Sequence, residues 1–302
     1  MHSIISKPNL FIVGAPKCGT TSMYHYLSQH PDIFMSRQKE INFFGKDFIW
    51  KNSDGKVDSI DNYLNFFKNA NNKKIVGEAS ATYIYSNSAC NEIYDFNPNS
   101  KIIIMLRNPI DMVISMHRQL LFTGNENEND LLEAIQLERS RRAMKNIPPM
   151  VDIINKLFYI ENIKSLPTRI LMYYNKFGNN NVHIVLLEDL SSNPSQEYLK
   201  ILSFLQLEGT FDPSYKIYNK GKIYRYRSIR KFIKQYSEIL GKFRGLFLSK
   251  PIGIMKLLER MNAKEIVADT NPETIIYIKE QLYETLDVIG SLIKRDISHW
   301  KN

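Results

Sequence analysis

The stretch NLFIVGAPKCGTTS, residues 9–22, is the most informative part of this 302-residue chain. Its apolar run at 10–13 predicts a short buried strand, and the turn that follows contains two glycines and a lysine. Hydroxyl residues at 20–22 then open a helix, whose positive dipole end faces the turn. A strand, a glycine turn and a helix N-terminus in this order indicate a phosphate-binding loop.

The position of the lysine distinguishes this loop from the common nucleotide-binding one. Gly14 and Gly19 fit the pattern GxxxxGK[ST], and Thr21 occupies its last position. Thr20 stands where that pattern requires lysine, and the cation is Lys17 instead. We therefore expect the lysine near the 5′ end of a nucleotide's phosphate chain, beside a bridging oxygen, and not at a γ-phosphate.

Composition and length suit one large α/β domain or two small ones. The hydrophobic content is 43%, ample for a sizeable core, and the chain carries a net charge of +9. Only two cysteines occur, which favours a reducing compartment over a disulfide framework. The first residues run almost directly into the predicted strand, and no apolar stretch reaches membrane-spanning length. We therefore expect a cytoplasmic protein.

A second candidate phosphate site lies in KIIIMLRNPIDMVISMHRQL, residues 101–120. The continuous apolar run at 102–106 is typical of a parallel strand covered on both faces. Arg107 follows at the carboxyl end of this strand, where open α/β sheets bind ligands. Residues 108–111 fit the start of a helix, and Ser115 lies on that helix. A guanidinium there can donate two parallel hydrogen bonds to one phosphate.

Together these motifs resemble those of sulfotransferases that use 3′-phosphoadenosine 5′-phosphosulfate (PAPS). PKCGTTS after a strand is similar to their 5′-phosphosulfate loop, and RNPxDxxxS to their 3′-phosphate site. The resemblance implies that the following residues bind the nucleotide: Lys17, Cys18, Gly19, Thr20, Thr21, Ser22, Arg107 and Ser115. It also implies one α/β domain over residues 1–302, with a parallel sheet of about five strands flanked by helices, related to P-loop proteins.

The acceptor side of this expected site is indicated by two further segments. KEINFF, residues 39–44, resembles the Glu and aromatic pair that supply the catalytic base in sulfotransferases acting on sugar chains. The resemblance assigns Glu40 as base and Lys17 as the cation at the leaving phosphate. EASATY, residues 78–83, is similar to their E-K-[ST]-x-x-Y pattern, but Ala79 replaces the lysine. Without this context, residues 39–44 are a solvated loop anchored by aromatic rings.

Two segments are interpreted as insertions in the expected domain. Residues of about 121–178 are predicted to form acceptor-covering helices. The segment of about 220–264 is strongly basic, and its start, Lys220, Gly221 and Lys222, resembles the loop that closes over the 3′-phosphate. Packing with a basic outer face is the simpler account of the remainder, and weak contact with a membrane surface is the alternative. No nucleic-acid-binding module is recognisable, so nucleic acid is not an expected partner.

The chain as a whole therefore resembles PAPS-dependent sulfotransferases of the bacterial soluble type, and we expect it to have their activity. The resemblance extends from Phe11 to Trp300 and implies in-line transfer of a sulfuryl group to a hydroxyl or amine, without a metal. Asn42 and Ala79 depart from the pattern of some glycan-specific members. A sugar, a glycolipid and a small metabolite therefore stay open as acceptors.

Two other functions compete with this interpretation. An apolar strand ending in Glu188 and Asp189 resembles the Mg²⁺-binding acid of a small-molecule P-loop kinase. The missing lysine at position 20 and the arginine site at 107 argue against the kinase. A catalytically inactive PAPS-binding module is the other alternative, and the presence of Lys17 and Glu40 argues against it.

Overall fold

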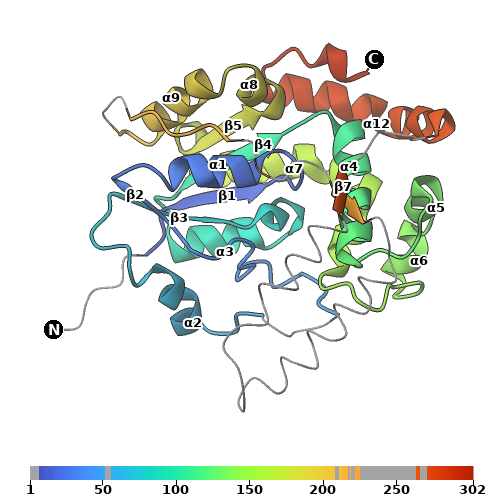
Figure 1. The fold of residues 1–302 in the computed structure, drawn as a ribbon, viewed down its shortest axis with the longest axis horizontal. Coiled ribbons are helices and arrows are strands. Elements are labelled where there is room, and N and C mark those ends of the chain that lie inside the picture. The colour runs from blue at the N-terminus through green and yellow to red at the C-terminus, as the bar shows by residue number, and fades with distance from the viewer. Residues whose placement is uncertain are drawn as a thin grey trace.

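The structure is a computed structural model that describes residues 7–51, 56–207, 211–216, 218 and 271–301, and the backbone alone of 222–224 and 263–265. A five-stranded parallel sheet forms its centre, in the strand order β2-β3-β1-β4-β5 (Figure 1). The strands are β1 Leu10–Gly14, β2 Ile33–Met35, β3 Ile75–Ala79, β4 Lys101–Leu106 and β5 Val182–Leu186. The predicted α/β fold with five parallel strands is confirmed.

The strand order places the two predicted phosphate motifs beside each other. β1 is the middle strand and pairs with β3 on one side and β4 on the other. The chain moves from β1 outward to β2 and β3, then crosses to β4 on the far side, so the order reverses at β1. Ligands of open α/β sheets bind at such a reversal, beyond the carboxyl ends of the strands. The loop after β1 and Arg107 after β4 lie at this edge.

Helices cover both faces of the sheet (Figure 1). One helix, α1 Thr20–Leu27, contacts β1, β2 and β3, whereas α7 Tyr159–Phe177 contacts β4, β5 and α3 Ala89–Phe96. The long C-terminal helix α12 Pro272–Ile293 packs on α7. The other α-helices of the described residues are α2 Ile60–Leu64, α4 Pro109–Thr123, α5 Leu131–Gln136, α6 Glu138–Arg142, α8 Leu187–Ser192 and α9 Pro194–Phe204. Among the described residues, no helix combines the length and apolar character needed to cross a bilayer.

The part of the chain that the structure describes also contains several short elements. Single-turn 3₁₀ helices are η1 Asn65–Phe67, η2 Ala81–Tyr85, η3 Ile154–Leu157, η4 Asn179–Asn181 and η5 Ser298–Lys301. β6 Lys222–Tyr224 and β7 Ala263–Glu265 form a separate antiparallel pair, of which β6 lies against α4. The start of the basic segment therefore lies at the helix that carries Ser115.

The predicted start of α4 is confirmed in detail. Asn108 Oδ1 accepts a hydrogen bond from the Ile110 amide over 3.0 Å, and Pro109 takes the first helical position. Gly124, with φ of 73°, ends the helix. Two other boundaries differ from expectation, since β2 was not predicted and β5 ends at Leu186. A three-residue strand is too short to show a period, and Glu188 consequently lies in the first turn of α8.

A buried ion pair anchors the predicted acceptor-covering region. Glu126 and the guanidinium of Arg141, on α6, are both fully buried and joined by two hydrogen bonds of 2.8 Å. Tyr159, at the start of α7, donates a third hydrogen bond to Glu126 over 2.8 Å. This network ties the segment around α5 and α6 to α7, which itself packs on the sheet. That the region covers an acceptor stays a prediction.

Candidate functional site

The loop after β1 is shaped by two glycines. Gly14 has a φ of 148°, and a Cβ there would lie 2.5 Å from Ile84 Cγ2 and 2.6 Å from the Ala81 carbonyl oxygen. Gly19 has a φ of 83° and forms the N-cap of α1. Neither position can take a side chain without strain, because the first lacks space and the second is left-handed. The loop therefore forms the predicted turn between β1 and the N-terminus of α1.

Lys17 lies in this loop as a half-buried cation among other cations. Its pKa is lowered to about 8, first by burial and then by the positive charges of Arg107 and Lys39, while Cys18 opposes the change. Its Nζ donates a hydrogen bond to Gln119 Oε1, on α4. Three cations from three segments thus lie close enough to repel one another. An anion among them would relieve this repulsion.

The hydroxyl residues at the start of α1 take different partners. Thr21 Oγ1 accepts a hydrogen bond from Lys39 Nζ over 2.8 Å, which brings Lys39 to the loop. Thr20 is buried, at 6% exposure, and Ser22 Oγ accepts a hydrogen bond from the Tyr218 amide over 3.4 Å. The predicted phosphate ligands at 20–22 therefore lie at the helix N-terminus, with Thr21 connected to the cation cluster.

Cys18 differs from its neighbours because its side chain turns into the core. Its thiol is fully buried and lies 3.3 Å from Met112 Sδ, on α4. Burial raises the pKa of this thiol, so it stays protonated. Cys18 can therefore contribute to a phosphate site only through its main chain.

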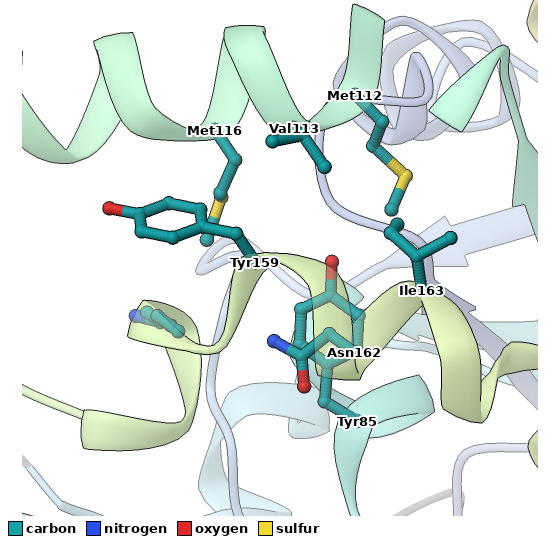
Figure 2. Close-up of a pocket in the computed structure, with 8 residues that line it drawn as sticks. Tyr85, Met112, Val113, Met116, Tyr159, Asn162 and Ile163 are labelled. Atoms are coloured by element: carbon teal, nitrogen blue, oxygen red, sulfur yellow. The ribbon is translucent and has the colours of Figure 1, made fainter. Parts of the chain in front are cut away.

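A small cavity lies directly behind this loop, between η2, α4 and α7. Figure 2 shows Met112, Val113 and Met116 of α4 facing Tyr85 and α7 across it. Its other lining residues are Lys156, Tyr159, Asn162 and Ile163. The cavity has room for at most about one water molecule, so η2, α4 and α7 are closely packed against one another.

Arg107 and Ser115 occupy the positions that the sequence predicted. Arg107 is half-buried at the end of β4, and its guanidinium donates a hydrogen bond to Asp111 Oδ2 over 3.0 Å. Ser115 is half-buried on α4, the helix against which β6 lies. Lys220 and Gly221 lie outside the described residues, and only the backbone of Lys222 is described. The arginine is therefore positioned beside Lys17, and the contribution of 220–222 stays a prediction.

Glu40 is exposed at the mouth of the site but is surrounded by protein. Its Oε2 accepts a hydrogen bond from the Ala81 amide over 3.1 Å. Burial of the group by surrounding atoms raises its pKa, while Lys39, Lys156 and the Ala81 amide lower it and Asp152 raises it. A solvent-accessible carboxylate with a raised pKa has the properties of a general base.

Sequence analysis missed the partners that α4 and η3 bring to the site. Gln119 accepts a hydrogen bond from Lys17, and the positive charge of Lys156 lowers the pKa of Glu40. Lys156 Nζ is itself held by Asp152 Oδ2 over 2.7 Å. Gln119 is 102 positions from Lys17 and Lys156 is 116 positions from Glu40, so no local pattern reports these two contacts. A polar residue one turn after Ser115, on the face of α4 that carries it, was the single available signal for Gln119.

The carboxylates that suggested a kinase are engaged elsewhere. Glu188 Oε1 accepts a hydrogen bond from the Asn108 amide over 2.9 Å, at the start of α4. Asp189 pairs with Arg295 over 2.6 Å. Both side chains therefore join elements of the fold, and the kinase interpretation loses its second motif.

A fully buried carboxylate, Glu78 on β3, makes the stability of the fold depend on pH. Burial raises its pKa from 4.5 to about 7, although the hydroxyls of Tyr83, Tyr63 and Ser80 oppose the change. The folded state therefore holds this proton more tightly, and the free energy of unfolding falls as pH rises from about 4.5 to 7. The loss attributable to Glu78 is about 3 kcal/mol.

Glu78→Gln is expected to remove this loss, because the amide cannot ionise. Chemical denaturation of both proteins at pH 5 and pH 8 measures it. The wild-type protein should lose about 2.5 kcal/mol more than the variant between the two pH values, since part of the loss has already occurred at pH 5. Burial also raises the pKa of Glu138 to about 7. Glu138 is present in both proteins, so its contribution cancels in the difference between their losses of stability. Equal pH dependence in the two proteins would show that Glu78 does not titrate as described.

The sequence profile described as "Sulfotransferase domain" matches residues 7–220. Among curated proteins, the chain is 28% identical to carbohydrate sulfotransferase 15 of Mus musculus over 247 residues, covering 66% of this chain and 44% of that protein. It is 30% identical to bifunctional heparan sulfate N-deacetylase/N-sulfotransferase 3 of Homo sapiens over 113 residues, 37% of this chain and 13% of that protein. The chain thus spans less than half the length of these relatives.

Among solved structures, a sulfotransferase from Alicyclobacillus acidocaldarius has a similar fold. The TM-score is 0.69 at 24% sequence identity, and the similarity covers 98% of this chain and 100% of that one. At this identity the likeness concerns the fold alone.

Proposed function

This chain belongs to the sulfotransferase family, and we propose that it transfers the sulfuryl group of PAPS to a hydroxyl or amine of an acceptor. The observation that carries the proposal is the meeting of Lys17, Lys39 and Arg107 at the carboxyl edge of the sheet, where burial and the charges of Arg107 and Lys39 lower the pKa of Lys17. A nucleotide with a 5′-phosphosulfate and a 3′-phosphate supplies the anions that such a site lacks.

The residues of the site fit this nucleotide in chemistry. Lys17, the amides at the start of α1 and the hydroxyls of Thr20 and Thr21 would hold the 5′-phosphosulfate. Arg107 and Ser115 would hold the 3′-phosphate, for which a guanidinium and a hydroxyl are suitable donors. Bound there, PAPS supplies an electrophilic sulfur and a phosphate leaving group. The contacts need no metal, because lysine, arginine and amides neutralise the phosphate charge.

Glu40 and Lys17 have different roles in the proposed reaction, Glu40 as general base and Lys17 as the cation at the leaving group. Glu40 removes the proton from the acceptor oxygen or nitrogen, and its raised pKa makes it a stronger base than an ordinary carboxylate. Lys17 stabilises the negative charge that develops on the departing phosphate oxygen. Lys39 connects the two halves, since it binds Thr21 and adjoins Glu40 in the chain.

The acceptor we propose is a sugar or a small metabolite bearing a free hydroxyl or amine. The curated relatives named above include a carbohydrate sulfotransferase and a heparan sulfate N-sulfotransferase, which supports a sugar. On this chain, the charge of Lys156 lowers the pKa of Glu40, but Lys156 is itself paired with Asp152 over 2.7 Å.

Thermal unfolding of the purified protein with nucleotides tests the proposed donor site. The desulfated product, 3′-phosphoadenosine 5′-phosphate (PAP), is compared with adenosine 5′-phosphate and with ATP plus Mg²⁺. A ligand that binds only the folded state raises the free energy of unfolding, by about 2.7 kcal/mol at a concentration of a hundred times its Kd, and the thermal midpoint rises with it. We expect PAP to stabilise the protein without Mg²⁺ and adenosine 5′-phosphate to do so far less. Stabilisation by Mg-ATP alone would replace the proposal with a kinase.

A further inference from the structure

The loop that carries Glu40 has an unusual backbone. Glu40 has a φ of 54° and Asn42 a φ of 51°, both in the left-handed region. Non-glycine residues avoid this region, although asparagine tolerates it better than most. Two such residues within three positions persist only where the surrounding structure holds them.

One segment, residues 79–83, supplies the partners that hold this loop. The Glu40 amide donates to the Ala79 carbonyl over 2.9 Å, and the Ala81 amide donates to Glu40 Oε2 over 3.1 Å. Tyr83 Oη accepts hydrogen bonds from the amides of Phe43 and Phe44, over 3.1 and 3.3 Å. Both the main chain and the carboxylate of Glu40 are therefore fixed from the end of β3.

Asn42 is the central side chain of this arrangement. The main-chain N–H of Asn42 donates a hydrogen bond to Ser80 Oγ over 3.1 Å, and its side-chain Nδ2 donates one to the main-chain carbonyl of Glu40 over 3.1 Å. Thr82 Oγ1 donates to Asn42 Oδ1 over 2.6 Å. Asn42 and Thr82 are only 6% and 3% exposed, so an acceptor in the cleft has little access to either.

We infer that Asn42, oriented by Thr82, is a positioning residue that sets the direction of the Glu40 carboxylate. The inference rests on the proposed role of Glu40 as base. A base must lie within hydrogen-bond reach of the proton that it removes, and a displacement of about 1 Å can cost a hundredfold in rate. The Asn42–Thr82 pair thus connects the main chain of Glu40 to η2.

Four variants test the inference. Thr82→Val removes the donor hydroxyl and keeps the shape, and Thr82→Ser restores the hydroxyl. Asn42→Gly removes the side chain but keeps a residue that accepts a positive φ. Thr274→Val is the matched control, because Thr274 is 2% exposed and lies on α12, away from this loop.

We expect Thr82→Val and Asn42→Gly to lower kcat by about 10- to 100-fold. Thr82→Ser should recover most of the rate, and Thr274→Val should keep it. The stabilisation of each protein by PAP should be unchanged, because the nucleotide site is intact. That readout does not depend on turnover and reports whether a variant is folded.

The pH profile of kcat distinguishes positioning from general support of the fold. Charges near Glu40 come from Lys39 on its own loop, from Lys156 and Asp152 at η3, and from Glu78 on β3. These groups are the same in all variants. Loss of the Ala81 hydrogen bond should therefore move the acid limb to higher pH in Thr82→Val and Asn42→Gly alone.

Each outcome decides between the alternatives. Wild-type kcat and pH profile in Thr82→Val and Asn42→Gly, alongside an inactive Glu40→Gln variant, would overturn the inference and leave the proposed function standing. Loss of PAP stabilisation in Thr82→Val, without recovery in Thr82→Ser, would show that Thr82 maintains the folded structure and does not position Glu40. An active Glu40→Gln variant would reject the base itself, and with it the reason for positioning.

Discussion

Glu40→Gln is expected to lower turnover by about 100- to 10,000-fold, the contribution that general bases make. Glutamine keeps the volume of the side chain, and its carbonyl oxygen can still accept the Ala81 hydrogen bond. It cannot take a proton from the acceptor. Stabilisation by PAP should therefore persist, because Glu40 is placed on the acceptor side of the site.

The matched control for this experiment is Glu92→Gln. Glu92, on α3, accepts hydrogen bonds from the amides of Gly45 and Lys46 over 3.1 and 3.0 Å, at the far end of the same loop. Loss of one carboxylate there tests whether any change in the support of the loop impairs turnover. Initial rates with PAPS and an accepted substrate provide the measurement. A Glu40→Gln variant that turns over at the wild-type rate would remove Glu40 from the role of base.

The phosphate half of the site was predictable because each motif is local. The loop after β1 and the residues after β4 are contiguous stretches, and parallel strands bring their carboxyl ends to one edge of the sheet. In the structure, Leu10–Gly14 and Lys101–Leu106 are neighbouring strands, and this adjacency brings Lys17 close to Arg107. Each motif could be found in the sequence, the topology of the fold supplies the contact between them, and their binding of phosphate stays a prediction.

Contacts on the acceptor side were out of reach for the opposite reason. The segments 39–44 and 78–83 were each identified, but nothing in the sequence indicates that Thr82 binds Asn42 or that Ala81 binds Glu40. These hydrogen bonds depend on left-handed backbone at 40 and 42, which side-chain periodicity does not report. The inward turn of the Cys18 side chain was hidden for the same reason, since a turn has no fixed face.

Lys17→Ala is expected to abolish measurable turnover, with a loss of at least about 100-fold from the leaving-group charge alone. Unlike Glu40→Gln, it should also weaken PAP binding, because the lysine belongs to the phosphate half of the site. Arg107 and Lys39 remain in the variant, so some stabilisation by PAP should persist. Thermal unfolding across a PAP titration separates the two variants without a turnover assay.

Because the pKa of Lys17 is lowered, PAP binding should weaken as the pH rises. With a pKa of about 8 in the free protein, Lys17 is mostly charged at pH 7 and mostly neutral at pH 9. Binding an anion at pH 9 must first restore the proton, so PAP affinity of the wild-type protein should fall about tenfold between these pH values. Lys17→Arg keeps its charge and should show little of this decline. If the arginine variant and the wild-type protein lost affinity in parallel, the titrating group would be another residue, and the site would not depend on the Lys17 charge.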